Sequence, residues 1–219
     1  MLEKYPQAET LVVSDNWLGS RRGIQGYNEM MMDKDFYDLF TDTEFILICH
    51  VDAWIFRDEL EEWCDAGYDI VAAPWPTRPH YRWFPFKQII KLKKELFYPN
   101  EIIRSQMMDR IGNGGLCLRK VKPFRDACVK YADTIQYFIK RSPENVHYNE
   151  DLFWALIPKE LKYPSVEEAL KFSYDLKPQV CHKLNKNNIP MGCHGYAHRS
   201  RIPFWQQFIP NLDTNDLKD

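Results

Sequence analysis

Residues 44–56 read EFILICHVDAWIF, and this stretch decides the predicted fold. It opens with five consecutive apolar residues, Phe45 to Cys49. A short apolar run that contains β-branched residues is typical of a strand buried on both faces, as in the middle of a parallel sheet. The run stops at His50, and Asp52 follows two residues later. Asp52 could cap the next turn, or it could lie in the crevice at the strand's carboxyl end, where open α/β sheets bind ligands.

A second strand is predicted shortly after the first. Residues 58–64 form a helix with acidic residues in its first turn, which ends near Gly67, and residues 68–75 form another apolar run. Strand, helix and strand within about 30 residues match the size of a βαβ unit. The pattern therefore predicts an α/β fold with a parallel sheet.

The overall composition indicates one globular domain over residues 1–219. The chain is 45% hydrophobic and 15% aromatic, which favours a packed core. A net charge of −2 argues against general nucleic-acid binding. The six cysteines form no CxxC pair and read as small buried hydrophobes in a reducing compartment. There is neither a signal core nor an apolar run long enough to span a membrane, so we expect a cytoplasmic protein, with peripheral membrane contact left open.

Several helices are predicted from apolar spacing. Residues 24–40 break near Asp33, which carries a helix-start signal, and residues 122–141 form one long amphipathic helix. Ser165 opens a further helix with a capping-box pattern. Lys87 to Phe97 form an amphipathic helix rich in lysine. Its basic side is either an ordinary solvated face or a patch that contacts anionic lipid or an anionic ligand.

Four polar clusters interrupt the apolar segments: His50 with Asp52, Gly112 to Gly115, Asn149 to Asp151, and His194. Each has an ordinary structural explanation when it is taken alone. The first could be a turn cap, the glycines a turn, the acidic group a helix cap, and the histidine a satisfied surface or core residue. None of the spacings fits a Walker loop, a dinucleotide fingerprint, a zinc finger or a nucleophile elbow.

Taken together, the motifs resemble a known family. They are, in order, Tyr27-Asn28, ILICHVDAWIFRDELEEWCDAGYDIVAAPW, GNGGLCLRK, NEDLFW, EEALKFS and PMGCHGY. This order resembles the bacterial family catalogued as domain of unknown function 5672, whose members are regarded as glycosyltransferases, and the resemblance runs from about residue 15 to residue 194. The family is similar to the GT-A class of nucleotide-sugar transferases. That similarity implies a Rossmann-like three-layer sandwich with a mainly parallel central sheet.

The resemblance implies a divalent-metal site for Mn²⁺ or Mg²⁺. Asp52 falls where GT-A enzymes place an acid of their D-x-D motif, and His50 stands where the other acid would be. His194 resembles a late histidine that reaches back to the metal or the diphosphate in several GT-A families. A histidine ligand at position 50 would favour Mn²⁺.

The resemblance also assigns roles in catalysis and substrate binding. Asn149 to Asp151 resembles the x-E-D motif of inverting GT-A enzymes, which makes Asp151 the general base and Glu150 a substrate or backbone anchor. The glycines would leave space for a sugar close to the backbone. Arg119 and Arg199 are further candidates for holding phosphate charge. Donor or acceptor binding is expected at Asn113, Gly114, Gly115, Tyr27, Asn28 and Trp75.

The expected function is sugar transfer from a nucleotide-diphosphate donor to a carbohydrate acceptor, with inversion or retention left open, in surface polysaccharide biosynthesis. Family members carry a strand–helix unit ahead of the region of residue 15. Only about ten residues precede Leu11 here, so we expect that unit to be missing and a second copy to cover the exposed sheet edge. The alternatives are a non-catalytic nucleotide-sugar or carbohydrate-binding protein and a metal-dependent phosphate-ester hydrolase.

Overall fold

The computed structural model describes residues 23–77 and 83–212, and the strand predicted at residues 10–13 lies outside them. The strands are β1 (Phe45–Cys49), β2 (Ala53–Ile55), β3 (Ile70–Ala72), β4 (Leu116–Lys120), β5 (Ser173–Tyr174) and β6 (Gly192–His194). The helices are α2 (Gly23–Met31), α3 (Lys34–Asp38), α4 (Leu60–Asp65), α5 (Phe86–Phe97), α6 (Val121–Lys130), α7 (Ala132–Arg141), α8 (Glu150–Leu156), α9 (Val166–Phe172), α10 (Pro178–Leu184) and α11 (Ile202–Trp205). Two 3-10 turns, η2 (Arg104–Met107) and η3 (Val146–Tyr148), complete the elements.

The larger sheet has the order β1-β4-β3, and β4 runs antiparallel to both of its neighbours. Leu118 of β4 pairs with Leu47 on one side and with Val71 on the other. The chain is therefore α/β, but the predicted GT-A-like sandwich with a mainly parallel central sheet is wrong, because small antiparallel and mixed sheets stand in its place. The strands at 45–49 and 70–72 do form, yet β4 separates them, so they are not the neighbouring strands of a βαβ unit.

The error has a physical cause. An apolar run indicates a strand, but it does not give the direction of the strand's neighbours. It does not give the depth of burial either: Phe45 to Ile48 are half-buried and Cys49 is exposed, so the predicted burial of this strand on both faces is wrong. Between β3 and β4 the chain makes a long excursion that includes α5. A connection of that length lets β4 enter the sheet in either direction.

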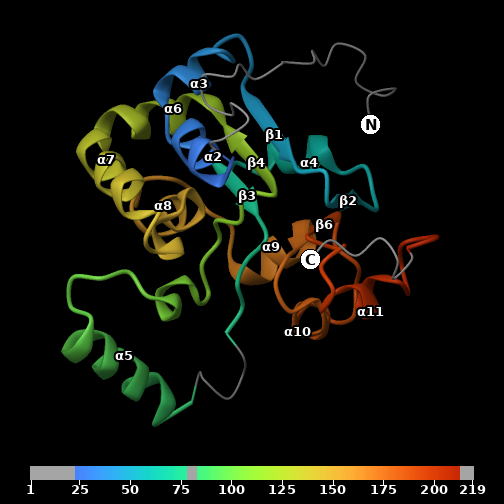
Figure 1. The fold of residues 1–219 in the computed structure, drawn as a ribbon. Coiled ribbons are helices and arrows are strands. Elements are labelled where there is room, and N and C mark those ends of the chain that lie inside the picture. Colours follow the sequence, from blue (N-terminus) through green and yellow to red (C-terminus); the bar gives the residue numbers. More distant parts are fainter. Residues whose placement is uncertain (1–22, 78–82, 213–219) are drawn as a thin grey trace.

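Side chains alternate between the two faces of this sheet and fill two cores. Ile70, Ala72 and Cys117 point toward a layer that contains α2, α3, α6, α7 and α8. Val71 and Leu118 point the other way, against Trp63 of α4 and other residues that include Phe172 of α9 and Met191. Helices thus pack on both faces, which explains why β3 and β4 are so apolar (Figure 1).

A second, smaller sheet has the order β2-β6-β5, with β6 antiparallel to β2 and parallel to β5. It packs with α10 and α11 around a separate aromatic core that includes Tyr174, Phe204 and Trp205. Only the turn at residues 50–52 separates β1 of the first sheet from β2 of the second. That turn carries His50 and Asp52, so the joint between the sheets also positions the candidate site.

Most local predictions agree with the structure. The helix break near Asp33 is confirmed, because the Asp33 carboxylate caps α3 by accepting a hydrogen bond from the backbone N–H of Asp35 at 2.9 Å. Ser165 likewise caps α9 by accepting from Glu168 N–H at 3.1 Å. The single long helix predicted at 122–141 is instead two helices, α6 and α7, separated at Tyr131.

Among the residues that the structure describes, no helix combines the length and the apolar character needed to cross a bilayer.

Candidate functional site

The turn between β1 and β2 is held by backbone hydrogen bonds to two other segments. The N–H of His50 donates to the carbonyl of Gly115 at 2.8 Å, and the N–H of Gly195 donates to the carbonyl of Asp52 at 2.9 Å. Ala53, the first residue of β2, pairs with His194 at the end of β6. These contacts bring together residues from three predicted polar clusters that are far apart in the sequence.

His50, Asp52 and His194 converge at this turn. Each offers a ligand atom, and the three atoms lie within 4.8 Å of one another. His194 Nε2 lies 3.3 Å from Asp52 Oδ1, and the two imidazole rings meet edge to face with their centroids 5.2 Å apart. Ligands of one divalent ion at bond lengths near 2.1 Å are about 3–4.2 Å apart. The three side chains therefore fit a single divalent ion after small rotamer adjustments.

The orientation of His194 favours cation binding. Its Nδ1 lies 3.3 Å from Asp175 Oδ1, and Arg201 holds that carboxylate with a hydrogen bond of 2.8 Å. When Nδ1 carries the proton and donates to Asp175, the lone pair of Nε2 faces the Asp52 carboxylate. Two electron-pair donors that face each other are stabilised by a proton or a metal ion between them. A histidine held by a carboxylate on its other nitrogen is a common arrangement around metals.

The electrostatics at His50 also suit a ligand. Burial lowers the pKa of His50, and the neighbouring His194 lowers it further. A lowered pKa keeps the imidazole neutral at physiological pH, which is the form that binds metals. Tyr27 of α2 steadies this ring, because its hydroxyl lies 3.0 Å from His50 Nε2 and 3.4 Å from the carbonyl of Gly114.

The glycine segment provides close packing, not open space. A Cβ on Gly115 would overlap the imidazole ring of His194, and a Cβ on Gly114 would overlap the carboxylate of Glu150. Asn113 is buried, accepts from the N–H of Gly115 at 3.1 Å, and lies 3.4 Å from His194 Nδ1. The glycines therefore allow His194 and Glu150 to approach the backbone, whereas we expected them to make room for a sugar.

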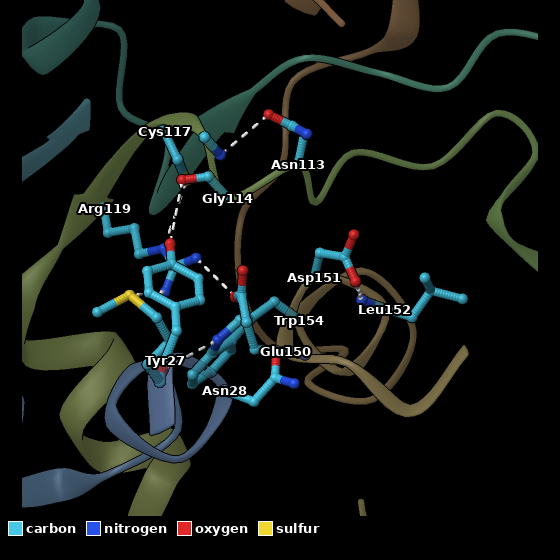
Figure 2. Close-up of polar contacts among 12 residues, drawn as sticks. Tyr27, Asn28, Asn113, Gly114, Cys117, Arg119, Glu150, Asp151, Leu152 and Trp154 are labelled. Atoms are coloured by element: carbon cyan, nitrogen blue, oxygen red, sulfur yellow. Dashed lines mark hydrogen bonds and ion pairs between the residues drawn. The ribbon is translucent and has the colours of Figure 1, made fainter. Parts of the chain in front are cut away.

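Glu150 is part of a buried ion pair. Its carboxylate accepts from Arg119 at 2.9 Å, and both side chains are almost completely excluded from solvent. Arg119 also donates to the hydroxyl of Tyr37 at 2.9 Å. Figure 2 shows Arg119 extending from β4 to Glu150 at the start of α8, beside Tyr27. Arg119 is thus buried and paired with Glu150, whereas Arg199 is exposed.

The start of α8 is fixed by Asn28. This buried side chain accepts from the N–H of Glu150 at 3.1 Å and donates to the side-chain oxygen of Asn149 at 3.0 Å. Asn28 therefore aligns the segment that carries the predicted general base.

Asp151 lies on the other side of α8 from the Arg119–Glu150 pair (Figure 2). Burial raises the pKa of Asp151 to about 8, and the negative charge of Glu150 is the next largest cause. Asp175 contributes in the same direction, which connects Asp151 electrostatically with the residue that holds His194. The backbone N–H of Leu152 donates to Asp151 at 2.8 Å. A carboxyl with its pKa near neutrality can take up or release a proton under physiological conditions.

Trp75 is buried next to Gly112, and its backbone N–H donates to the carbonyl of Arg110 at 3.0 Å. Its described contacts are with the loop that precedes β4, so the structure does not bring it to the His50–Asp52–His194 cluster.

A cavity of about 390 Å³ opens beside Asp52. Trp54 and Tyr196 contribute aromatic surface to it, and their rings meet edge to face with centroids 6.0 Å apart. Residues 209–212 form another part of its wall. Binding sites for small molecules commonly combine such apolar surface with a few polar groups.

Sequence reasoning missed two residues of the site, Asp175 and Arg201. Asp175 follows β5 directly, so it carries the same signal as Asp52, an acid at the end of a strand. A strand of only two residues is too short to be recognised from its pattern. Arg201 shows no local signal, because its role depends on reaching Asp175 across 26 positions in sequence.

Comparison with known proteins identifies a family but no activity. The profile described as "Protein of unknown function (DUF5672)" matches residues 7–194. No curated protein matches the chain, and no solved structure matches it. The profile covers most of the chain and confirms the family suggested by its motifs. The chain therefore belongs to the DUF5672 family of proteins of unknown function.

Proposed function

We propose that this protein is a glycosyltransferase, which uses a divalent cation to transfer a sugar from a nucleotide-diphosphate donor to a hydroxyl group of a carbohydrate acceptor. The observation that carries the proposal is the convergence of His50, Asp52 and His194 within 4.8 Å. Asp151, with its pKa raised to about 8, supplies a proton acceptor, and a small part of that rise comes from the charge of Asp175, which lies next to His194.

The cluster and Asp151 would have different tasks. Asp52, His50 and His194 would hold Mn²⁺ or Mg²⁺, which supplies positive charge to the leaving diphosphate when it is bound. The acceptor oxygen would form a bond to the anomeric carbon of the sugar as the bond from that carbon to the diphosphate oxygen breaks. Asp151 in its ionised form would take the proton of the attacking hydroxyl. A carboxylate with a raised pKa holds that proton better than an ordinary one does.

The cavity beside Asp52 supports the same proposal. Its volume of about 390 Å³ suits a sugar ring. Trp54 and Tyr196 offer flat apolar surface for the ring's C–H groups, while Asp52 brings the cation cluster to the edge of the cavity.

The ligand set supports a second candidate. Two imidazoles and one carboxylate with open positions also hold ferrous iron in oxygenases. That chemistry leaves Asp151 without a role, so we place sugar transfer first. Oxygen uptake that requires Fe²⁺ and His194, with no release of nucleoside diphosphate from any sugar donor, would favour the oxygenase.

The test combines binding with turnover. The protein is incubated with UDP- and GDP-sugars, Mn²⁺ and a set of glycan acceptors, and release of nucleoside diphosphate is measured. We expect Asp52→Asn and His194→Ala to weaken Mn²⁺ binding in calorimetry and to abolish transfer. Asp151→Asn should retain donor binding and lose transfer. Asp65→Asn, at an exposed position at the end of α4, is the matched control and should behave like the wild type.

Each contrary result has a defined meaning. Full transfer activity in Asp151→Asn would reject the base assignment. Donor binding without turnover or metal dependence would favour the non-catalytic alternative. Mn²⁺ binding that is unchanged in both Asp52→Asn and His194→Ala would reject the metal centre.

A further inference from the structure

Helix α5 (Phe86–Phe97) presents an unusual amount of apolar surface. None of its twelve residues is buried. Leu92 is 54% exposed and Leu96 is 65% exposed, and just before the helix Trp83 is 73% exposed and Phe84 is 81% exposed. Figure 1 shows α5 at one end of the molecule, away from both sheets. Large apolar side chains gathered on one exposed segment indicate a binding surface.

The exposed side chains of α5 are sorted by face. Ile89, Leu92 and Leu96 follow one another at intervals of three and four residues, so they lie on the same side of the helix. The opposite side carries lysines 87, 91 and 94. Lys93 lies within the apolar arc, where its long stem can cover apolar surface while its ammonium group reaches outward.

The positive charge of residues 83–98 indicates an anionic partner. Residues 83–98 contain four lysines and only one acidic residue, Glu95, in a chain whose net charge is −2. Apolar and aromatic side chains on one face with lysines on the other are typical of helices that lie in the interface of a bilayer. Lys87, Lys91 and Lys93 complement anionic headgroups, whereas the ammonium group of Lys94 donates to the carbonyls of Tyr98 and Pro99. A helix of 12 residues spans about 18 Å, which is too short to cross a bilayer and suits an in-plane orientation.

Packing against the rest of the protein and pairing with a second copy explain this apolar face less well than a bilayer does. Ile90 and Lys93 border a cavity of about 720 Å³ that residues 98–108 also line, so the edge of the apolar arc that carries these two residues already faces the protein. Leu92 and Leu96 do not line that cavity and lie toward the other edge of the arc, where they are exposed. Pairing of two copies through this apolar face would leave the lysines of the opposite side pointing outward, so a second copy would not use the positive charge of the segment.

We propose that α5, together with Trp83 and Phe84, docks on the surface of an anionic lipid bilayer. The apolar face enters the boundary between headgroups and acyl chains, and the lysines contact anionic headgroups. This surface is separate from the candidate metal centre, so the inference stands independently of the proposed transfer reaction.

Vesicle sedimentation tests the proposal with the full-length protein. Vesicles of phosphatidylcholine alone are compared with vesicles that contain about one third phosphatidylglycerol. We expect binding to the anionic vesicles only, and weaker binding at high salt. Lys87→Glu with Lys91→Glu should lower the affinity by at least fivefold for each lysine. Leu92→Glu with Leu96→Glu should lower it by more than tenfold, because two side chains lose their apolar contact.

A matched control is available on α6. Val129 is 55% exposed, and the Lys122 side chain is 83% exposed, so Val129→Glu with Lys122→Glu replaces one exposed apolar residue and one exposed lysine at a site unrelated to α5. This variant should bind anionic vesicles nearly as the wild type does. Circular dichroism checks that every variant is folded.

Fluorescence gives an independent readout of position. Lipids brominated near the headgroup should quench part of the tryptophan emission, and Trp83→Phe should remove most of that quenching. The proposal is overturned by any of three results. These are no binding to anionic vesicles, equal binding to neutral ones, or loss of binding in the α6 control that matches the loss in the α5 variants. Self-association abolished by Leu92→Glu with Leu96→Glu, without vesicle binding, would assign the face to a second copy.

Discussion

Replacing Glu150 with alanine tests whether this residue supports the fold or the chemistry. Glu150 is 3% exposed, and its carboxylate lies 2.9 Å from the guanidinium of Arg119, which is 0% exposed. Burial raises the pKa of Glu150, and Arg119 opposes that rise. Without Glu150, the Arg119 guanidinium keeps the Tyr37 hydroxyl as a neutral oxygen partner at 2.9 Å, but no charge compensates it.

Removing one partner of a buried ion pair costs about 3–5 kcal/mol. For a domain of this size, each kcal/mol lowers the melting temperature by about 2–4 °C, so the loss should amount to roughly 6–20 °C. The matched control is Glu95→Ala. Glu95 forms an exposed pair with Lys91 at 3.7 Å, and such pairs contribute about 0.5 kcal/mol or less.

Urea unfolding at pH 7, monitored by circular dichroism, measures the free energy of unfolding that Glu150→Ala and Glu95→Ala each lose. A double variant, Arg119→Met with Glu150→Leu, gives the sharper comparison, because it removes the ion pair without leaving a buried charge. We expect it to recover much of the stability lost in Glu150→Ala, since buried ion pairs can often be replaced by apolar residues of similar volume. The reasoning is refuted if Glu150→Ala stays within about 1 kcal/mol of the wild type, or if the double variant is no more stable than Glu150→Ala.

Further predictions concern proton and metal binding. The pKa of Asp151 is about 8 in the folded chain and about 3.9 when unfolded. The folded state therefore keeps a proton that the unfolded state has lost, and stability should fall as pH rises from about 4 to 8. Asp151→Asn should flatten this fall in urea midpoints, whereas Asp65→Asn should not. If transfer occurs, kcat/KM should rise with pH toward the pKa of Asp151. Gly115→Ala should weaken Mn²⁺ binding by about tenfold or more, because its Cβ displaces His194. Gly67→Ala, which strains a backbone φ of +78° but touches nothing within 4 Å, should lower stability and leave Mn²⁺ affinity unchanged, as calorimetry can check.

The sequence by itself determined the features whose causes are local. The apolar run at 45–49 forms a strand, the Asp33 and Ser165 side chains cap helices, and the lysine-rich segment after Pro85 forms an amphipathic helix. Each depends on residues within a few positions, through side-chain caps or through helical and strand periodicity. The short polar clusters could be singled out for a related reason, because charged residues at the end of an apolar segment need either solvent or a partner.

Only the tertiary structure decided how these pieces are joined. The direction of β4 follows from a long connection whose path no local pattern restricts. The partners of Glu150 and His194, Arg119 and Asp175, lie 31 and 19 positions away. A buried charge can be satisfied by any opposite charge that packing brings near it, so its partner is a property of the packed core. For that reason Glu150 is expected from the sequence to be a substrate or backbone anchor and is a buried ion-pair partner in the fold.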